Sequence, residues 1–205
     1  MPKTLYLVRH GETDFNSDPE PRIRGRIELD LNQIGIKNAL KTASFLNNIH
    51  FDSVLSSEIN RAKQTAHIII SESNENHNKR IQCEPDLIDV CWGDWEGKTF
   101  IEVFSNNSSA YMKAPNKIQP PNGETFSQVL HRMDKMMHKI NECKEETICI
   151  VSHGSVFSVL ACYMLQMPLD KIWSFYMNNC AVSKVIMKDI DTYQICYWNQ
   201  THHLE

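Results

Sequence analysis

An arginine, a histidine and a glycine follow the first apolar run of the chain, and these residue types can do chemistry together. The run Leu5–Val8 is followed at once by Arg9, His10 and Gly11, as a buried strand ending in a tight turn would be. Ligands of open α/β sheets bind at the carboxyl ends of strands. A histidine there can be a nucleophile, and an arginine beside it offers a planar fork for phosphate. We therefore hypothesise phosphoryl transfer to His10, with a purely structural strand end as the alternative.

The same pattern recurs late in the chain. Thr147–Val151 has the near-continuous apolar character of a buried parallel strand, and His153 and Gly154 follow it after one serine. Arg61 lies in the first turn of an expected helix, where an anion would suit it. Neighbouring parallel strands would bring these groups to one edge of the sheet. Such a set of cations is costly unless it binds a dianion such as phosphate.

A carboxylic acid near this edge could protonate a leaving group. The segment 85–97 is rich in carboxylates and ends in Trp92-Gly93-Asp94-Trp95-Glu96-Gly97, which we interpret as a closed, packed loop. Burial in such a loop raises the pKa of a carboxyl group toward use as a general acid. The alternative is a loop whose tryptophans only fill the core.

The order of apolar segments predicts an α/β protein, a three-layer α/β/α sandwich with a mainly parallel sheet. We expect a single domain over residues 1–205, with a cap or lid segment at about residues 98–123. Asn32 is expected to cap the first long helix, and Glu124 to open a later one. Residues 11–27 are expected to form a polar loop. The predicted strands cover residues 5–8, 52–57, 81–84, 147–151, 181–187 and 193–198.

Composition excludes several functional classes. The net charge of −4 disfavours a nucleic acid or an anionic membrane as partner. No apolar run is long enough for a membrane span. The seven cysteines include no C-x-x-C pair, so we expect reduced thiols and a cytoplasmic protein. His131 and His138 lack the spacing of metal ligands and are expected on the surface.

Four blocks of the sequence carry a resemblance to a known family. They are Leu7-Val8-Arg9-His10-Gly11-Glu12-Thr13 with Asn16, Ser56 to Ala66 around Arg61, Gly93-Asp94-Trp95-Glu96-Gly97, and Val151-Ser152-His153-Gly154. In this order they resemble the histidine phosphatase superfamily, the family of cofactor-dependent phosphoglycerate mutase. The resemblance covers nearly the whole chain and implies a phosphoglycerate mutase-like fold.

The resemblance also implies a role for each matching residue. His10 would accept the phosphoryl group as a phosphohistidine, which water would then hydrolyse. The arginine and histidine side chains of the site would supply the positive charge, so no metal and no other cofactor is expected. The phosphoryl oxygens would be held by Arg9, Asn16, Arg61, His153 and Gly154.

Two departures from the family pattern concern the proton donor and a substrate loop. The position matching the family's catalytic glutamate is Asp89, one methylene shorter, with Glu12 and Glu96 as the other candidates. The loop that usually reads Gly-x-x-Asp-x-Pro-Leu-Thr is Gly25 to Asn32 here, so contacts near Arg22 to Arg26 are not carried over.

The resemblance favours a phosphomonoester hydrolase acting on a small phosphorylated metabolite. Resembling mutases carry a longer, basic insertion, whereas residues 97–121 contain only three lysines and no arginine. Pro121 to Glu124 and Met167 to Trp173 look similar to α-ribazole phosphatases, so α-ribazole phosphate is a candidate substrate beside those of broad-specificity phosphatases. A phosphoglycerate mutase is the alternative, and a noncatalytic phosphate-binding module is a third. A homodimer is a further expectation.

Overall fold

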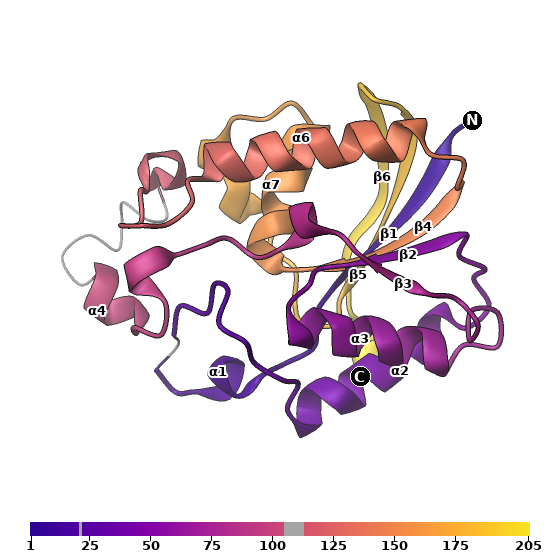
Figure 1. Ribbon diagram of the computed structural model, residues 1–205, viewed down its shortest axis with the longest axis horizontal. Helices are drawn as coiled ribbons and strands as arrows, with labels where there is room; N and C mark the ends of the chain where they lie inside the picture. Colours follow the sequence, from indigo (N-terminus) through magenta and orange to yellow (C-terminus); the bar gives the residue numbers. More distant parts are fainter. Residues whose placement is uncertain (21, 105–112) are drawn as a thin grey trace.

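The computed structural model describes residues 1–20, 22–104 and 113–205. Its centre is a six-stranded sheet with strand order β3-β2-β4-β1-β5-β6 (Figure 1). The first four strands along the chain run parallel, β5 runs antiparallel to β1, and β6 runs antiparallel to β5 and so in the direction of the first four. The strands are β1 Lys3–Arg9, β2 Ser53–Ser56, β3 Ile81–Cys83, β4 Thr147–Ser152, β5 Val182–Asp189 and β6 Thr192–Gln200.

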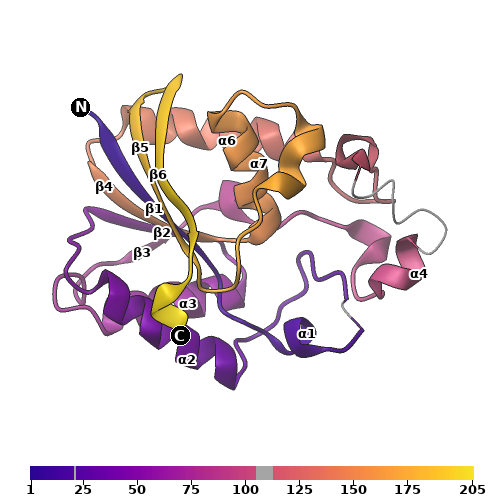
Figure 2. The ribbon, with the colours of Figure 1, turned by 180° about the vertical axis from the view of Figure 1, so that it is seen from behind.

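Helices cover both faces of this sheet, which confirms the predicted three-layer α/β architecture. The helices α6 and α7 lie on one face, and α2 and α3 lie on the other (Figures 1 and 2). The helices are α1 Asp14–Ser17, α2 Gln33–Leu46, α3 Asn60–Ser71, α4 Phe100–Phe104, α6 Phe126–Glu142 and α7 Gly154–Met164.

The position of β1 inside the sheet, with helices over both faces, explains why its sequence is so apolar. Leu5 and Leu7 pack into the core beneath α6 and α7, and Tyr6 and Val8 pack into the core beneath α2 and α3. Successive side chains of a strand point to opposite faces, so a strand covered on both faces must be apolar at every position.

The pairing of β1 with β4 brings the two strand–His–Gly units together. The strands are parallel neighbours, with Val8 opposite Val151 and Arg9 opposite Ser152. Each strand therefore ends at the same edge of the sheet, and His10 and His153 follow side by side. This juxtaposition is the one expected from the sequence.

Two local expectations differ from the structure, and the sequence left the direction of the last two strands open. The loop 11–27 contains the one-turn helix α1, because Thr13 and Asn16 form a capping box there. Helix α6 begins at Phe126 with Thr125 as its N-cap, two residues after Glu124, since Thr125 and Gln128 also form a capping box. The strands β5 and β6 are antiparallel because the connection between them is too short for a parallel crossover.

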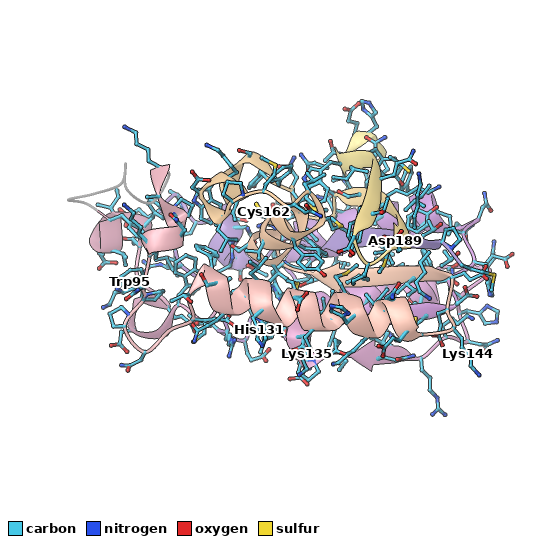
Figure 3. The ribbon with its side chains drawn as sticks, turned by 90° about the horizontal axis from the view of Figure 1, so that it is seen from above. Trp95, His131, Lys135, Lys144, Cys162 and Asp189 are labelled. Carbon is cyan, nitrogen blue, oxygen red and sulfur yellow. The ribbon has the colours of Figure 1, made fainter. Side chains whose placement is uncertain are left out.

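The described part of the expected cap or lid consists of α4 and a 3-10 turn at Pro115–Lys117. Residues 105–112 of that segment lie outside the described residues. Asn32 caps α2 as expected, since its side chain accepts a hydrogen bond from Gly35 N. None of the described helices combines the length and the apolar character needed to cross a bilayer. Figure 3 shows α6 with His131 on it. His131 and His138 are both exposed.

Candidate active site

His10 is buried directly after β1 and has one ring nitrogen committed to the backbone. Its Nδ1 lies 2.7 Å from the carbonyl oxygen of Gly11. A carbonyl oxygen can only accept, so Nδ1 carries the proton and Nε2 keeps the lone pair. Burial first, and then the charge of Arg61, holds the pKa of His10 well below its usual value. The ring is therefore a neutral imidazole with a free nucleophilic nitrogen.

Two hydrogen bonds and one close packing contact hold the backbone of His10 and Gly11. Gly11 N donates to Thr65 Oγ1 at 2.9 Å, and Asn179 Nδ2 donates to the carbonyl oxygen of His10 at 2.9 Å. A Cβ at Gly11 would lie 2.9 Å from the carbonyl oxygen of Gly35, which explains the need for glycine here. The strand end is thus rigid where the candidate nucleophile projects.

His153 follows β4 and occupies the N-cap position of α7. The centroid of its ring is 5.1 Å from that of His10. Its Nε2 lies 2.8 Å from Ser57 Oγ, while its Nδ1 has no hydrogen bond and faces Asp89 Oδ2 at 3.4 Å. Burial, followed by the charge of Arg61, lowers the pKa of His153 well below its usual value.

Arg9 leaves the end of β1 and turns toward α7. Its Nη1 donates to the carbonyl oxygen of Met177 at 2.5 Å and to Tyr176 Oη at 3.3 Å. The Tyr176 ring lies beneath the guanidinium, 5.6 Å from ring centroid to Cζ. A Cβ at Gly154 would lie only 3.2 Å from Arg9 Nε, so the glycine that begins α7 leaves room for the guanidinium.

Arg61 is fully buried in the first turn of α3 and joins three other segments. Its Nη2 donates to the Gly25 carbonyl oxygen at 2.7 Å and to Asp89 Oδ2 at 2.8 Å. Its Nη1 donates to the Ile27 carbonyl oxygen at 2.9 Å. The side chain therefore contacts both the loop after α1 and the segment that carries Asp89.

Three buried nitrogen atoms at this edge have no hydrogen-bond partner: Arg9 Nε, Arg61 Nε and His153 Nδ1. An unsatisfied buried polar group costs about 1–3 kcal/mol, and a charged one costs more. An oxyanion with several acceptor oxygens would satisfy them together. The arrangement is that of an anion-binding site built around a neutral histidine.

A cleft opens over these groups. A cavity of about 190 Å³, called here the histidine cavity, is lined by Arg9, His10, Arg24, Asp89, Gly154, Ser155, Ser158, Trp173 and Tyr176. A second cavity of about 210 Å³, the adjoining cavity, is lined by Arg22, Ile23, Arg24, Gly25, Asp89, Trp92, Phe100 and Ser155. The two share Arg24, Asp89 and Ser155, so they form one cleft.

Of the three carboxylates considered as proton donor, only Asp89 lines this cleft. Glu12 Oε1 accepts hydrogen bonds from Ser17 Oγ and Asn32 Nδ2, which ties α1 to the start of α2. Glu96 Oε1 accepts from the backbone N–H groups of Arg26 and Trp92. Both glutamates stabilise loops, which leaves Asp89 as the acid that faces a ligand.

Both the oxygen and the nitrogen of the Asn16 side-chain amide have hydrogen-bond partners within the protein. Its Oδ1 accepts from Thr13 N at 3.0 Å, and its Nδ2 donates to Asn179 Oδ1 at 3.2 Å. It is not among the residues that line the two cavities. Contact between Asn16 and a phosphoryl group stays a prediction.

Sequence reasoning missed Asn179 and gave Arg24 no role. The arginines around Gly25 indicated that this loop could attract an anion. The direction of the Arg24 side chain, however, depends on how residues far away in the chain hold the loop. Asn179 precedes β5, and β5 pairs antiparallel with β1. The start of one strand therefore meets the end of the other, and this relation follows only once the antiparallel pairing is known.

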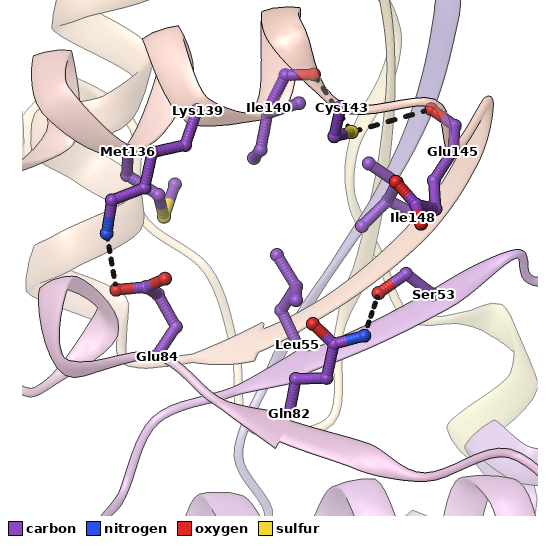
Figure 4. A pocket seen from close by; sticks show the side chains of 10 residues that line it. All are labelled: Ser53, Leu55, Gln82, Glu84, Met136, Lys139, Ile140, Cys143, Glu145 and Ile148. Atoms are coloured by element: carbon purple, nitrogen blue, oxygen red, sulfur yellow. Dashed lines mark hydrogen bonds and ion pairs between the residues drawn. The ribbon is translucent and has the colours of Figure 1, made fainter.

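Another cavity, of about 150 Å³, lies between the end of α6 and the sheet (Figure 4). It borders the starts of β2 and β4, at the opposite end of the strands from the histidines. Its lysine, Lys139, is already bonded to Glu84 and Asp86. Neither a histidine nor an arginine is among the residues that line it.

Comparisons with known proteins agree with the geometry of the site. The family model for the histidine phosphatase superfamily (branch 1) matches residues 5–201. The adenosylcobalamin/α-ribazole phosphatase of Escherichia coli K12 is 31% identical over 175 residues, which are 83% of this chain and 83% of that protein. Phosphoserine phosphatase 1 of Hydrogenobacter thermophilus is 29% identical over 189 residues, 90% of this chain and 87% of the relative.

The fold has close counterparts among solved structures as well. The structure of Bacillus stearothermophilus YhfR superimposes with a TM-score of 0.88 at 29% identity, covering 99% of this chain and 100% of the other. Since the two curated relatives are named as phosphatases, a mutase is not favoured. The chain belongs to the histidine phosphatase superfamily, branch 1, and is a phosphatase.

Proposed function

We propose that this phosphatase hydrolyses a phosphate monoester of a small metabolite through a phosphohistidine at His10. Nε2 of His10 attacks phosphorus as the ester P–O bond breaks, and the departing oxygen takes a proton from Asp89. Arg9, Arg61 and His153 stabilise the charge on the phosphoryl oxygens. The observation that supports this best is the neutral, buried His10 beside two guanidinium nitrogens without a partner, Arg9 Nε and Arg61 Nε.

The second step reverses these roles. Water attacks the phosphorus of the phosphohistidine, and the Asp89 carboxylate accepts the proton that the water loses. The P–N bond breaks, which releases inorganic phosphate and neutral His10. Asp89 suits both steps because it lines the cleft within 3.4 Å of His153 Nδ1.

The candidate substrates come from the names of the relatives. α-Ribazole phosphate is one, and phosphoserine is another. A noncatalytic phosphate-binding module is disfavoured because the nucleophile, the oxyanion donors and a cleft-facing acid all occur together. We also propose that the protein works in the cytoplasm, since all seven cysteines are free thiols. The homodimer stays a prediction.

The test is hydrolysis of p-nitrophenyl phosphate without added metal, from mildly acidic to neutral pH. Turnover together with acid-labile labelling of the protein from ³²P-substrate is the expected result. An absence of turnover across that range would sink the proposal. Interconversion of phosphoglycerates on addition of 2,3-bisphosphoglycerate, in place of hydrolysis, would establish the mutase instead.

A further inference from the structure

Arg24 is a cation in the cleft that the transfer chemistry described above does not use. It lines both the histidine cavity and the adjoining cavity. Burial first, and then the charge of Arg9, lowers the pKa of Arg24 to about 10, so it stays charged at neutral pH. No hydrogen bond or ion pair joins its guanidinium to another residue in the described part of the chain. A half-buried charge without a partner is costly, so a ligand would stabilise it.

Hydrogen bonds hold the backbone on both sides of Arg24. Ile23 N donates to the carbonyl oxygen of Lys98 at 2.9 Å, just before Arg24. Just after it, the Gly25 carbonyl oxygen accepts from Arg61 Nη2 at 2.7 Å. Gly25 has φ +50°, a conformation that favours glycine and fixes the turn.

Arg22, two residues before Arg24, already has hydrogen-bond partners for its guanidinium. Arg22 Nε bonds Asp18 Oδ2 at 3.1 Å, and its Nη1 donates to the Gly97 carbonyl oxygen at 3.0 Å. Arg22 therefore shapes the adjoining cavity without offering an unpaired charge. Arg24 is the cation that remains for a ligand group in that half of the cleft.

A count of charges indicates what that group is. Arg9 and Arg24 line the cleft, the guanidinium of Arg61 bonds Asp89 in its wall, and the two histidines are neutral. When Asp89 carries the proton that it donates, a phosphoryl dianion offsets two of the three positive charges. One positive charge is left, and it matches one further negative charge on the substrate.

We propose that Arg24 binds a carboxylate of the substrate, so that the enzyme prefers phosphate monoesters of short-chain carboxylic acids. A guanidinium binds a carboxylate with two parallel hydrogen bonds. Because Arg24 shares a cavity of about 190 Å³ with His10, the carboxylate must lie only a few bonds from the phosphate. Phosphoserine and phosphoglycerate have this spacing, whereas α-ribazole phosphate has no acid group besides its phosphate. This inference rests on the proposed phosphatase function.

The experiment compares matched substrates that differ only at the carboxylate. Phosphoserine is paired with phosphoethanolamine, and 3-phosphoglycerate is paired with glycerol 3-phosphate. We expect kcat/KM to be at least about tenfold higher for the acid of each pair. p-Nitrophenyl phosphate is measured alongside, because turnover of this substrate reports the phosphatase function alone.

Variants then assign the preference to Arg24. Arg24→Gln should bring the ratio within each pair close to one, and Arg24→Lys should restore part of it. The exposed Arg80 gives a matched control, since Arg80→Gln should leave the ratio unchanged.

Each unfavourable outcome has a distinct meaning. A ratio near one in the unmodified enzyme, with normal turnover of p-nitrophenyl phosphate, would overturn the inference and leave the phosphatase intact. The same holds for an unchanged ratio in Arg24→Gln, or for a higher kcat/KM on α-ribazole phosphate than on either acid. No turnover of any of these substrates would refute the proposed function itself.

Discussion

The Nη2 atom of Arg61 lies 2.8 Å from Oδ2 of Asp89, and that same oxygen faces Nδ1 of His153 at 3.4 Å. One carboxylate thus contacts both Arg61, a candidate ligand for phosphate, and one of the two buried histidines. Asp89 has one methylene fewer than the glutamate expected at this position. The contact shows that the shorter side chain still reaches the cleft from its own loop.

His10→Ala should abolish turnover, because it removes the Nε2 atom that attacks phosphorus in the proposed mechanism. We expect kcat to fall about 10³-fold or more and labelling by ³²P-substrate to disappear. Far-ultraviolet circular dichroism should be unchanged. The exposed His131 gives a matched control, since His131→Ala should keep full activity. Phosphoenzyme formation by the His10 variant would refute the assignment of the nucleophile.

Asp89→Asn should slow substrates in proportion to their need for a proton. Alkyl phosphates leave as poor alkoxides, so their kcat should fall about 10²-fold. p-Nitrophenol departs readily, and its release should fall much less. Glu12→Gln is the control, because Glu12 bonds Ser17 and Asn32 outside the cleft. Equal losses on both substrates in Asp89→Asn would argue that a different group is the acid.

The buried histidines should make the fold sensitive to mild acid. Folding lowers the pKa of His10 and of His153, chiefly through burial. In the unfolded chain they titrate near about 6.5. Below that pH the unfolded state binds protons that the native state does not, so the free energy of unfolding falls as the pH falls from about 7 to 5. Each histidine contributes at most about 1.4 kcal/mol per pH unit.

Urea unfolding in phosphate-free buffer at several pH values measures this slope. His10→Gln should make the slope shallower, because it removes one of the buried histidines. His203 also has a pKa lowered by burial, so part of the slope should persist in the His10 variant. An identical slope with and without His10 would contradict the cause given for its pKa.

Gly154→Ala should damage the site without damaging the fold. The added methyl group would lie 3.2 Å from Arg9 Nε and push the guanidinium away. A small misplacement of this kind can cost about 10²-fold in rate. The free energy of unfolding should change by less than about 0.5 kcal/mol, because alanine suits the first turn of a helix. Thermal unfolding and kcat/KM together test this, and a loss of both would count against it.

Asn179→Ala should weaken the strand end that carries His10. Its amide donates to the carbonyl oxygens of His10 and Gly11 at 2.9 and 3.2 Å. Losing these bonds should cost about 1–2 kcal/mol in unfolding free energy and lower kcat. The adjacent Asn178 is exposed, so Asn178→Ala is the matched control. Equal effects of the two substitutions would show that the amide of Asn179 has no special role.

How far the sequence predicted the site depends on the kind of contact. His10 and His153 were predictable because both follow apolar strands, and parallel neighbours end at one edge. The position of Arg24 in the cleft was not predictable, because its loop is held by Lys98 and Arg61, which are far away in the chain. Asn179 was missed because its role depends on the antiparallel pairing of β5 with β1, which no local sequence pattern predicts.

The fold shows the same division. Continuous apolar runs identified β1 and β4, and Asn32 identified the start of α2. The helix α1 was missed because one turn leaves no periodic pattern, and only its capping box holds it. The start of α6 was expected at Glu124, two residues before its first residue, Phe126. The carboxylate of Glu124 bonds Arg132 and Arg26.

Arg61 makes three hydrogen bonds that hold the walls of the cleft together, to Gly25, Ile27 and Asp89. Its remaining nitrogen, Nε, is the one without a partner. The same side chain is therefore a joint of the scaffold and a candidate ligand for phosphate. A drop in kcat on replacing Arg61 would mix lost architecture with lost catalysis. A substitution at Arg61 must therefore meet two constraints at once, that of the scaffold and that of the candidate phosphate site.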